Sequence, residues 1–179
     1  RSARIGRHSS ERVSFDAQGI IGFVGNVEQT RGGTTEIIIT PNYESMSKTS
    51  AAIIAREVKR KHDLVLGLAT GDTPVGTYKE LAKLHKEEGL DFSKVTTFNL
   101  DEYLDLAPLH RNSYNYFMWE NFFKHVNVSP HKAFVPQGNT DDPEMFSEWY
   151  EKQIKDAGGI DLQVLGIGRD GHIGFNEPG

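Results

Sequence analysis

The side chains best suited to chemistry lie near the end of the printed sequence, where Asp170, His172 and Glu177 fall within eight residues. An imidazole exchanges protons near neutral pH, and a carboxylate two residues away is close enough to orient it. The segment Ile160–Gly179 therefore predicts a proton-transfer site. The alternative is an ordinary glycine turn with a solvated histidine, and this segment alone does not separate the two.

An apolar run precedes these three residues and is typical of a buried strand: Leu162, Val164, Leu165 and Ile167. Glycines at 166, 168 and 171 then permit backbone conformations that a side chain would forbid. We therefore expect the three side chains to emerge together from the end of one strand.

A second acidic loop follows another expected strand, residues 95–100, and carries Asp101 and Glu102. Adjacent side chains leaving a strand point in different directions, so one carboxylate can face a pocket while the other makes structural hydrogen bonds. A carboxylate against an apolar wall has a raised pKa and can take a proton from a carbon beside a carbonyl or imine. The alternative is a helix-capping Asp followed by a solvated Glu.

A third loop, residues 70–77, follows the expected strand 64–68. Thr73 is expected to cap the next helix and Pro74 to take its first position, which would leave amide N–H groups facing an anion. No Gly-Lys-Ser/Thr of a Walker loop is present. A carboxylate at Asp72 would oppose an anion if it pointed inward, and an ordinary capped helix start is the other interpretation.

Strands and helices alternate along residues 36–179. Besides the strands already given, 37–39 reads as a strand, and helices are expected at 43–61, after Pro74, at 113–125 and at 142–159. The alternation indicates an α/β fold of three α/β/α layers, Rossmann-like, with a mostly parallel sheet that is incomplete here. Ligands bind beyond the carboxyl ends of strands in such sheets, which is where all three loops lie.

Residues 1–35 do not follow this pattern, and we exclude them from the expected fold as a poorly ordered leader of uncertain origin. Arg1–Arg7 contains no acid and resembles the start of a transit peptide. An added or mistranslated leader is the alternative, since no Met begins it. The domain is therefore expected to span residues 36–179.

The composition excludes several classes of protein. A net charge of −5 over 179 residues argues against nucleic-acid and membrane-surface binding, and no apolar run approaches the ~18 residues of a membrane span. The absence of cysteine excludes disulfides and thiolate metal sites, and fits a reducing, cytoplasmic location. The remaining histidines lack metal-ligand spacing, and the aromatic row between Tyr114 and Phe123 is expected to pack in a core.

Four separated phrases occur in order: ATGDTPVGTYKEL, VTTFNLDEY, SYNYFMWENFF and LGIGRDGHIGFNEPG. Together they resemble the glucosamine-6-phosphate deaminase family, also called glucosamine-6-phosphate isomerase, over residues 36–179. The resemblance implies amino-sugar catabolism, including that of N-acetylglucosamine. It implies conversion of glucosamine 6-phosphate to fructose 6-phosphate and ammonia, without metal or organic cofactor.

The resemblance also implies roles for individual residues. Asp101 would be the base that takes the C2 proton, and His172 would act in ring opening with Asp170 and Glu177 tuning it. Part of the phosphate site would be formed by Thr70, Gly71, Asp72 and Thr73.

Two features depart from the family pattern. The position of Asp72 is usually small and uncharged, and the family continues beyond Gly179 with a lid, basic phosphate contacts and further strands. We therefore expect weak activity or none from the isolated fragment. The only partner expected is a small amino-sugar phosphate, with a homo-oligomer, hexameric by family resemblance. Some members are activated by N-acetylglucosamine 6-phosphate, but the resemblance assigns no regulatory contact to a residue of this chain.

Two alternatives to the deaminase stay open. The similar 6-phosphogluconolactonases also carry a glycine loop and a Gly-His motif, although the phrases FNLDEY and HIGFNEP favour the deaminase. A truncated, non-catalytic sugar-phosphate-binding domain is the other.

Overall fold

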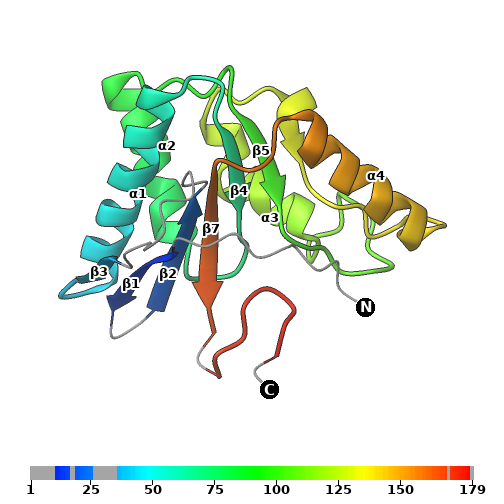
Figure 1. The fold of residues 1–179 in the computed structure, drawn as a ribbon, viewed down its shortest axis with the longest axis horizontal. Helices are drawn as coiled ribbons and strands as arrows, with labels where there is room; N and C mark the ends of the chain where they lie inside the picture. Colours follow the sequence, from blue (N-terminus) through cyan, green and yellow to red (C-terminus); the bar gives the residue numbers. More distant parts are fainter. Residues whose placement is uncertain (1–10, 17–18, 26–35, 169, 178–179) are drawn as a thin grey trace, which may run out of the picture.

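The computed structural model describes residues 11–16, 19–25, 36–168 and 170–177, with backbone alone for the first two ranges. Their longer elements form an α/β fold (Figure 1). The strands are β1 (Glu11–Asp16), β2 (Gly19–Gly25), β3 (Glu36–Ile39), β4 (Val65–Leu68), β5 (Thr96–Asn99), β6 (Ala133–Phe134) and β7 (Leu162–Ile167). The α-helices are α1 (Tyr43–Arg60), α2 (Val75–Glu88), α3 (Tyr114–Asn121) and α4 (Pro143–Asp156).

The seven described strands form one sheet in the order β3-β1-β2-β7-β4-β5-β6. The chain proceeds from β4 to β5 and β6 on one side of β4, then returns to the other side to form β7. Strands β7, β4, β5 and β6 are parallel to one another, β1 is parallel to β3, and only the pairs that involve β2 are antiparallel. The reversal beside β4 is the kind of switch point at which open α/β sheets bind ligands.

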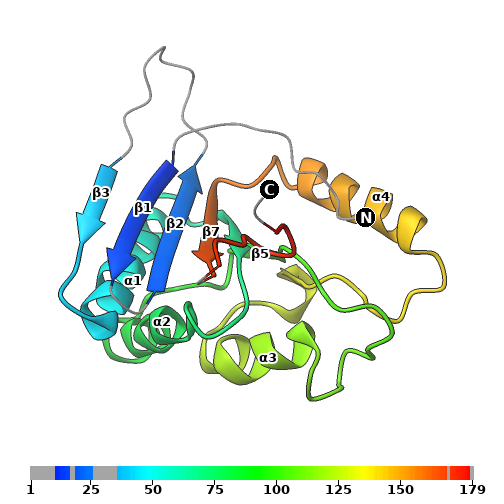
Figure 2. The ribbon, with the colours of Figure 1, turned by 90° about the horizontal axis from the view of Figure 1, so that it is seen from below.

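The helices cover both faces of the sheet. Figure 2 shows α1, α2 and α3 on one face and α4 on the other. Right-handed crossovers explain this division, because connections that run in opposite directions along a sheet place their helices on opposite faces. The expected three-layer, mostly parallel fold is therefore confirmed.

Alternate residues of the sheet supply two separate cores. Leu66 and Leu68 are buried against α1, α2 and α3, whereas Val65 and Phe98 pack with Tyr150 of α4 on the other face. Burying a large apolar side chain contributes about 1.5–3 kcal/mol, so these contacts hold the layers together. The Tyr150 hydroxyl also lies 2.9 Å from the carbonyl oxygen of Asn99, joining α4 to the end of β5.

The start of β7 is fastened to the start of β4. The Asp161 carboxylate accepts hydrogen bonds from Lys61 Nζ at 2.6 Å and from the Val65 N–H at 2.8 Å. The Asp161 N–H donates to the Val65 carbonyl at 2.9 Å. These contacts precede the Leu66–Leu162 pair and set the register of the two strands.

Residues 11–16 and 19–25 differ from the expectation that the first 35 residues stay outside the fold. They form β1 and β2, which connect β3 to β7. Strand pairing uses backbone groups, so their weak side-chain pattern did not indicate it. The origin of the segment is untested, and its other residues lie outside the described part of the chain.

Smaller differences concern element ends. The helix expected at residues 113–125 is α3 followed by a 3₁₀ turn at Phe123–His125, and the two-residue β6 was not expected. Helix α2 begins at Val75, and Pro74 occupies the N-cap position without a side-chain hydrogen bond. The prediction that Thr73 caps this helix is therefore wrong. Among the described residues, no helix is long and apolar enough to cross a membrane.

Helices α1 and α2 are in close contact at Gly76. A Cβ on this residue would lie 2.2 Å from Ser47 Oγ and 2.9 Å from Tyr43 Cε1. Such distances are far inside van der Waals contact, so the glycine permits the packing. The contact also determines where the loop before α2 lies relative to the sheet.

We predict that Gly76→Ala lowers the free energy of unfolding by about 1–3 kcal/mol, because the added methyl group overpacks a buried contact. Gly166→Ala is the control, since a Cβ there meets no atom of the described residues within 4 Å. Its expected effect is below about 0.5 kcal/mol. Urea unfolding measures both variants, and equal losses would contradict the role given to Gly76.

Candidate active site

Three loops leave the carboxyl ends of the neighbouring strands β7, β4 and β5. These are residues 168–177, 70–74 and 100–113, the loops expected to carry the chemistry. In Figure 1 the loop after β7 lies beyond the tip of its arrow, at the lower edge of the sheet. The topology thus brings the three segments to one edge, at the switch point beside β4.

Asp101, in the loop after β5, lies against the loop after β7. Its Oδ2 atom is 3.1 Å from the point that a Cβ on Gly174 would occupy, and Gly174 has φ +59°. Burial, with a smaller contribution from the neighbouring Glu102 charge, raises the pKa of Asp101 to about 6. A carboxyl group with this pKa is ionised at neutral pH yet is a stronger base than an exposed aspartate.

Glu102 has a different role from its neighbour. Its carboxylate accepts hydrogen bonds from the N–H groups of Tyr114 at 2.8 Å and Asn115 at 2.9 Å, at the start of α3. It also accepts from the Tyr103 N–H at 3.0 Å. A negative charge at a helix N-terminus is favourable, so Glu102 joins the loop to α3. Glu102 is thus the member of the acidic pair that makes structural hydrogen bonds.

Asp170 and His172 form the pair that their spacing predicts. Asp170 Oδ1 lies 2.6 Å from His172 Nδ1, and this hydrogen bond is the main reason that the pKa of Asp170 is lowered. The imidazole packs over Gly168, where a Cβ would lie 2.2 Å from the ring. Glu177 is exposed, and no hydrogen bond within the described residues joins it to His172.

The hydroxyl of Tyr43, a residue of α1, holds the loop before α2 in place. That hydroxyl accepts from the Gly76 N–H at 2.8 Å and lies 2.9 Å from the carbonyl oxygen of Asp72. The Val75 N–H donates to the same carbonyl at 3.3 Å. These two helix-start N–H groups are therefore occupied, which corrects the expectation that they face an anion.

The loop N–H groups that remain belong to Gly71, Asp72 and Thr73. No hydrogen bond among the described residues engages them. Gly71 has φ +92°, a conformation that strongly favours glycine. Asp72 is exposed, and Thr70 and Thr73 are partly buried. The loop N–H groups without a hydrogen bond among the described residues therefore lie before the helix.

Three aromatic rings join the loop after β5, the start of α3 and the loop after β7, and sequence reasoning missed these contacts. Tyr103 and Tyr114 have ring centroids 4.9 Å apart, and Phe175 lies 5.1 Å from Tyr103 and 5.9 Å from Tyr114. The expected core packing of Tyr114 with its helical neighbours describes only one side of this residue. Tyr114 directly follows Ser113, the N-cap of α3, on the side facing the acidic loop. This position was the signal that the sequence offered.

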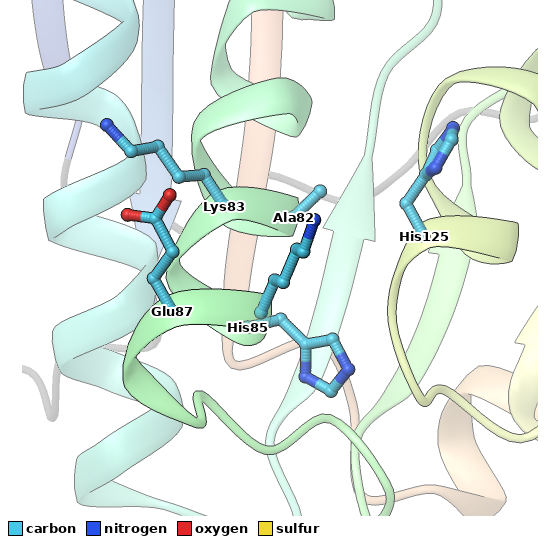
Figure 3. Close-up of a pocket in the computed structure, with 6 residues that line it drawn as sticks. Ala82, Lys83, His85, Glu87 and His125 are labelled. Atoms are coloured by element: carbon cyan, nitrogen blue, oxygen red, sulfur yellow. The ribbon is translucent and has the colours of Figure 1, made fainter.

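Figure 3 shows a hollow of about 370 Å³ on a different part of the surface, along the end of α2. His85, Lys86 and His125 contribute to its lining. No residue of the three loops lines this hollow, so we do not place the site there. Within the part of the chain that the structure describes, no group of three or more His, Asp or Glu side chains could hold a metal ion.

The fold and the site define an α/β protein with acid–base groups at the carboxyl edge of its sheet. Family comparison gives the narrower assignment. The chain belongs to the family described as glucosamine-6-phosphate isomerases/6-phosphogluconolactonase, whose model matches residues 42–174.

Curated relatives extend the comparison. A glucosamine-6-phosphate deaminase of Thermoanaerobacter sp. is 54% identical over 143 residues, which are 80% of this chain and 56% of that protein. Glucosamine-6-phosphate deaminase 2 of Bacillus subtilis is 54% identical over 144 residues, covering 80% and 58%. The chain thus spans a little over half the length of these relatives.

Solved structures agree with the fold. A monomeric glucosamine-6-phosphate deaminase is similar with a TM-score of 0.76 and 49% identity, covering 78% of this chain and 58% of its own. A 6-phosphogluconolactonase from Thermotoga maritima has a TM-score of 0.53 at 21% identity, covering 70% and 59%. The second likeness concerns the fold alone.

We predict that Asp101→Asn raises the free energy of unfolding at pH 7.5 by about 1–2 kcal/mol, allowing for solvent screening. The folded-state pKa of about 6 exceeds the ordinary value of 3.8, so ionisation destabilises the fold. This penalty is complete above pH 6, shrinks as pH falls from 6 to 4, and is absent below about pH 3.8.

Denaturant unfolding of parent and variant at several pH values measures the gain. Asp72→Asn is the control, because Asp72 is exposed, and we expect less than about 0.5 kcal/mol at either pH. A gain from Asp101→Asn that does not change between pH 4 and 7.5 would contradict the burial of this carboxylate.

We further predict that Glu102→Gln lowers the pKa of Asp101, because a like charge disappears while burial persists. An NMR titration of the Asp101 carboxyl carbon follows this directly. Glu120→Gln provides a control on the exposed side of α3, with no expected change in that pKa. An unchanged Asp101 titration in Glu102→Gln would show that the neighbouring charge has no influence.

Proposed function

We propose that this chain carries the acid–base residues of a glucosamine-6-phosphate deaminase. The observation that carries the proposal is the placement of the partly buried Asp101 carboxylate against Gly174, in the loop of the Asp170–His172 pair. Deaminase relatives that are 54% identical over 80% of the chain support the same substrate. Since the chain spans 56% of the first relative, the activity, substrate and partners of the whole protein are part of this proposal.

Ring opening is the first step proposed. The bond between C1 and the ring oxygen breaks, the C1 hydroxyl loses its proton, and the ring oxygen gains one. His172 is suited to this transfer because Asp170 at 2.6 Å fixes its Nδ1 and stabilises a positive ring, which leaves Nε2 to exchange a proton. Glu177 is proposed to act on the same histidine, although the described contacts do not join them.

Isomerisation follows in the open-chain sugar. Asp101 takes the C2 proton while the C2 ammonium group gives a proton to the aldehyde oxygen, which leaves an enolamine. The Asp101 carboxylic acid then delivers its proton to C1 and leaves an iminium at C2. Water adds to C2, its two protons pass to the nitrogen, and the C–N bond breaks to release ammonium and fructose 6-phosphate. The raised pKa of Asp101, about 6, suits both halves of the transfer.

The phosphate is proposed to bind the unengaged N–H groups of Gly71, Asp72 and Thr73, together with the Thr70 hydroxyl. Fixed backbone donors at a helix start bind anions well. Neither a metal nor an organic cofactor is needed for this sequence of steps. The Asp72 carboxylate would oppose the phosphate if it turned inward.

The same experiments test two alternative functions. A lactonase is compatible with the fold, and a non-catalytic sugar-phosphate-binding domain is compatible with the 56% coverage of the first relative. The hexamer suggested by resemblance is a separate proposal, and one similar deaminase is described as monomeric. Light scattering tests the assembly, and cell fractionation tests the cytoplasmic location.

We predict that ammonia release from glucosamine 6-phosphate, where the chain supports it, rises with pH through about 6 and falls at least 10³-fold in Asp101→Asn. The base must be ionised, and general acid–base catalysis contributes typically 10²–10⁴-fold. Coupled assay of ammonia and hydrolysis of 6-phosphogluconolactone are run on the same samples.

Each outcome distinguishes the candidates. Lactone hydrolysis without ammonia release would favour the lactonase. Calorimetric binding of glucosamine 6-phosphate without turnover, in both parent and Asp101→Asn, would favour the binding domain. Ordinary turnover by the 179-residue chain would contradict the expectation that the isolated fragment has weak activity or none.

A further inference from the structure

Two of the three aromatic rings at the site, those of Tyr103 and Tyr114, are also joined through their hydroxyl groups. The Tyr114 hydroxyl donates to the Tyr103 hydroxyl at 3.2 Å. Burial is the largest cause of the raised Tyr114 pKa, and the hydrogen bond with Tyr103 adds to it.

The Tyr103 hydroxyl has a hydrogen left to donate. Each hydroxyl has a single hydrogen, and Tyr114 directs its own to Tyr103. The Tyr103 hydroxyl therefore accepts from Tyr114 and keeps its own hydrogen for a further partner. No acceptor for that hydrogen occurs among the described residues. Hydrogen-bonded hydroxyls polarise one another, which makes the terminal group a better donor.

The position of Tyr103 puts this donor at the site. It is two residues after Asp101, and its ring contacts Phe175, three residues after His172. The side chain of Tyr103 is 46% exposed, unlike the buried rings of the core. Asp101 also lies close enough to Tyr114 to affect its titration. The two tyrosine hydroxyls are thus close to the proposed base, Asp101.

The loop that carries Tyr103 is held in place by a backbone contact. A Cβ on Gly138 would lie 2.0 Å from the Tyr103 carbonyl oxygen, and the Asp105 N–H donates to the Gly138 carbonyl at 2.8 Å. Asp105 itself adopts φ +66°, an uncommon conformation for a residue with a side chain. The tyrosine is therefore attached to a fixed backbone, as a ligand-binding donor requires.

We propose that Tyr103 is a substrate-binding residue whose hydroxyl donates to an oxygen of the sugar, and that Tyr114 is the positioning residue that orients this hydroxyl. The proposal rests on the sugar-phosphate site proposed above. The hydrogen bond between the two hydroxyls then fixes the direction in which Tyr103 donates.

The test measures binding of glucosamine 6-phosphate and of inorganic phosphate by calorimetry, with Asp101→Asn present in every sample so that the sugar is not consumed. Tyr103→Phe is expected to weaken sugar-phosphate binding about 5- to 10-fold, the value of one hydrogen bond. Tyr114→Phe is expected to weaken it about 2- to 5-fold, because Tyr103 keeps its hydroxyl but loses its orientation. Neither should change the binding of inorganic phosphate, because the loop N–H groups are intact.

Tyr116→Phe is the matched control, on the same helix and also partly buried, and we expect less than about 2-fold change. In the double variant, Tyr114→Phe should add nothing to Tyr103→Phe, since the orienting group has lost its target. If the effects of the two substitutions on binding multiply, the positioning role of Tyr114 is refuted. Equal weakening of both ligands would overturn the sugar contact.

The proposed function and the role of Tyr103 can be refuted separately. If the Asp101→Asn chain with all tyrosines binds neither ligand, the phosphate site is refuted and this inference with it. If that chain binds both ligands and Tyr103→Phe binds them equally well, only the inference is refuted. Circular dichroism of each variant confirms that the fold is retained.

Discussion

The pairing of β7 with β4 is the constraint on which the site depends. Asp161 joins the two strands through Lys61 and the Val65 backbone, and the Leu66–Leu162 pair follows in parallel register. Because strand pairing sets where each strand ends, this contact also sets where the loops after β4 and β7 begin. A shift of one residue would turn every β7 side chain to the other face. The reacting groups are thus positioned by hydrogen bonds at the opposite edge of the sheet.

The division of labour between Asp101 and Glu102 follows from the same geometry. One carboxylate lies against Gly174 and has a raised pKa, while its neighbour accepts three backbone hydrogen bonds. Burial of a carboxylate without a positive partner is unfavourable, and the adjacent charge increases this effect. The cap on α3 offsets part of it by stabilising the loop in which both residues lie. Basicity and rigidity at this loop therefore come from two residues that are chemically almost the same.

Much of this arrangement could be predicted from the sequence because it is encoded in local patterns. Apolar runs marked the strands, and the short Asp170–His172 spacing indicated the pair found at 2.6 Å. What the patterns lacked was information about distant backbone contacts. Strands β1 and β2 are paired through main-chain groups, and Tyr43 replaces the expected Thr73 cap from another helix. The contacts among Tyr103, Tyr114 and Phe175 likewise join residues separated by up to 72 positions, which periodicity does not detect.

Burial of Asp101 has a consequence for how this chain would change under selection. The fold is less stable with an ionised carboxylate at this position than with a neutral side chain of similar size. A search for variants that tolerate heat or protease would therefore enrich neutral residues at position 101. Such a search would remove the proposed base while improving every measure of folding. An acid at this partly buried position is thus better explained by the proposed chemistry than by structure, as expected where stability and activity make opposite demands.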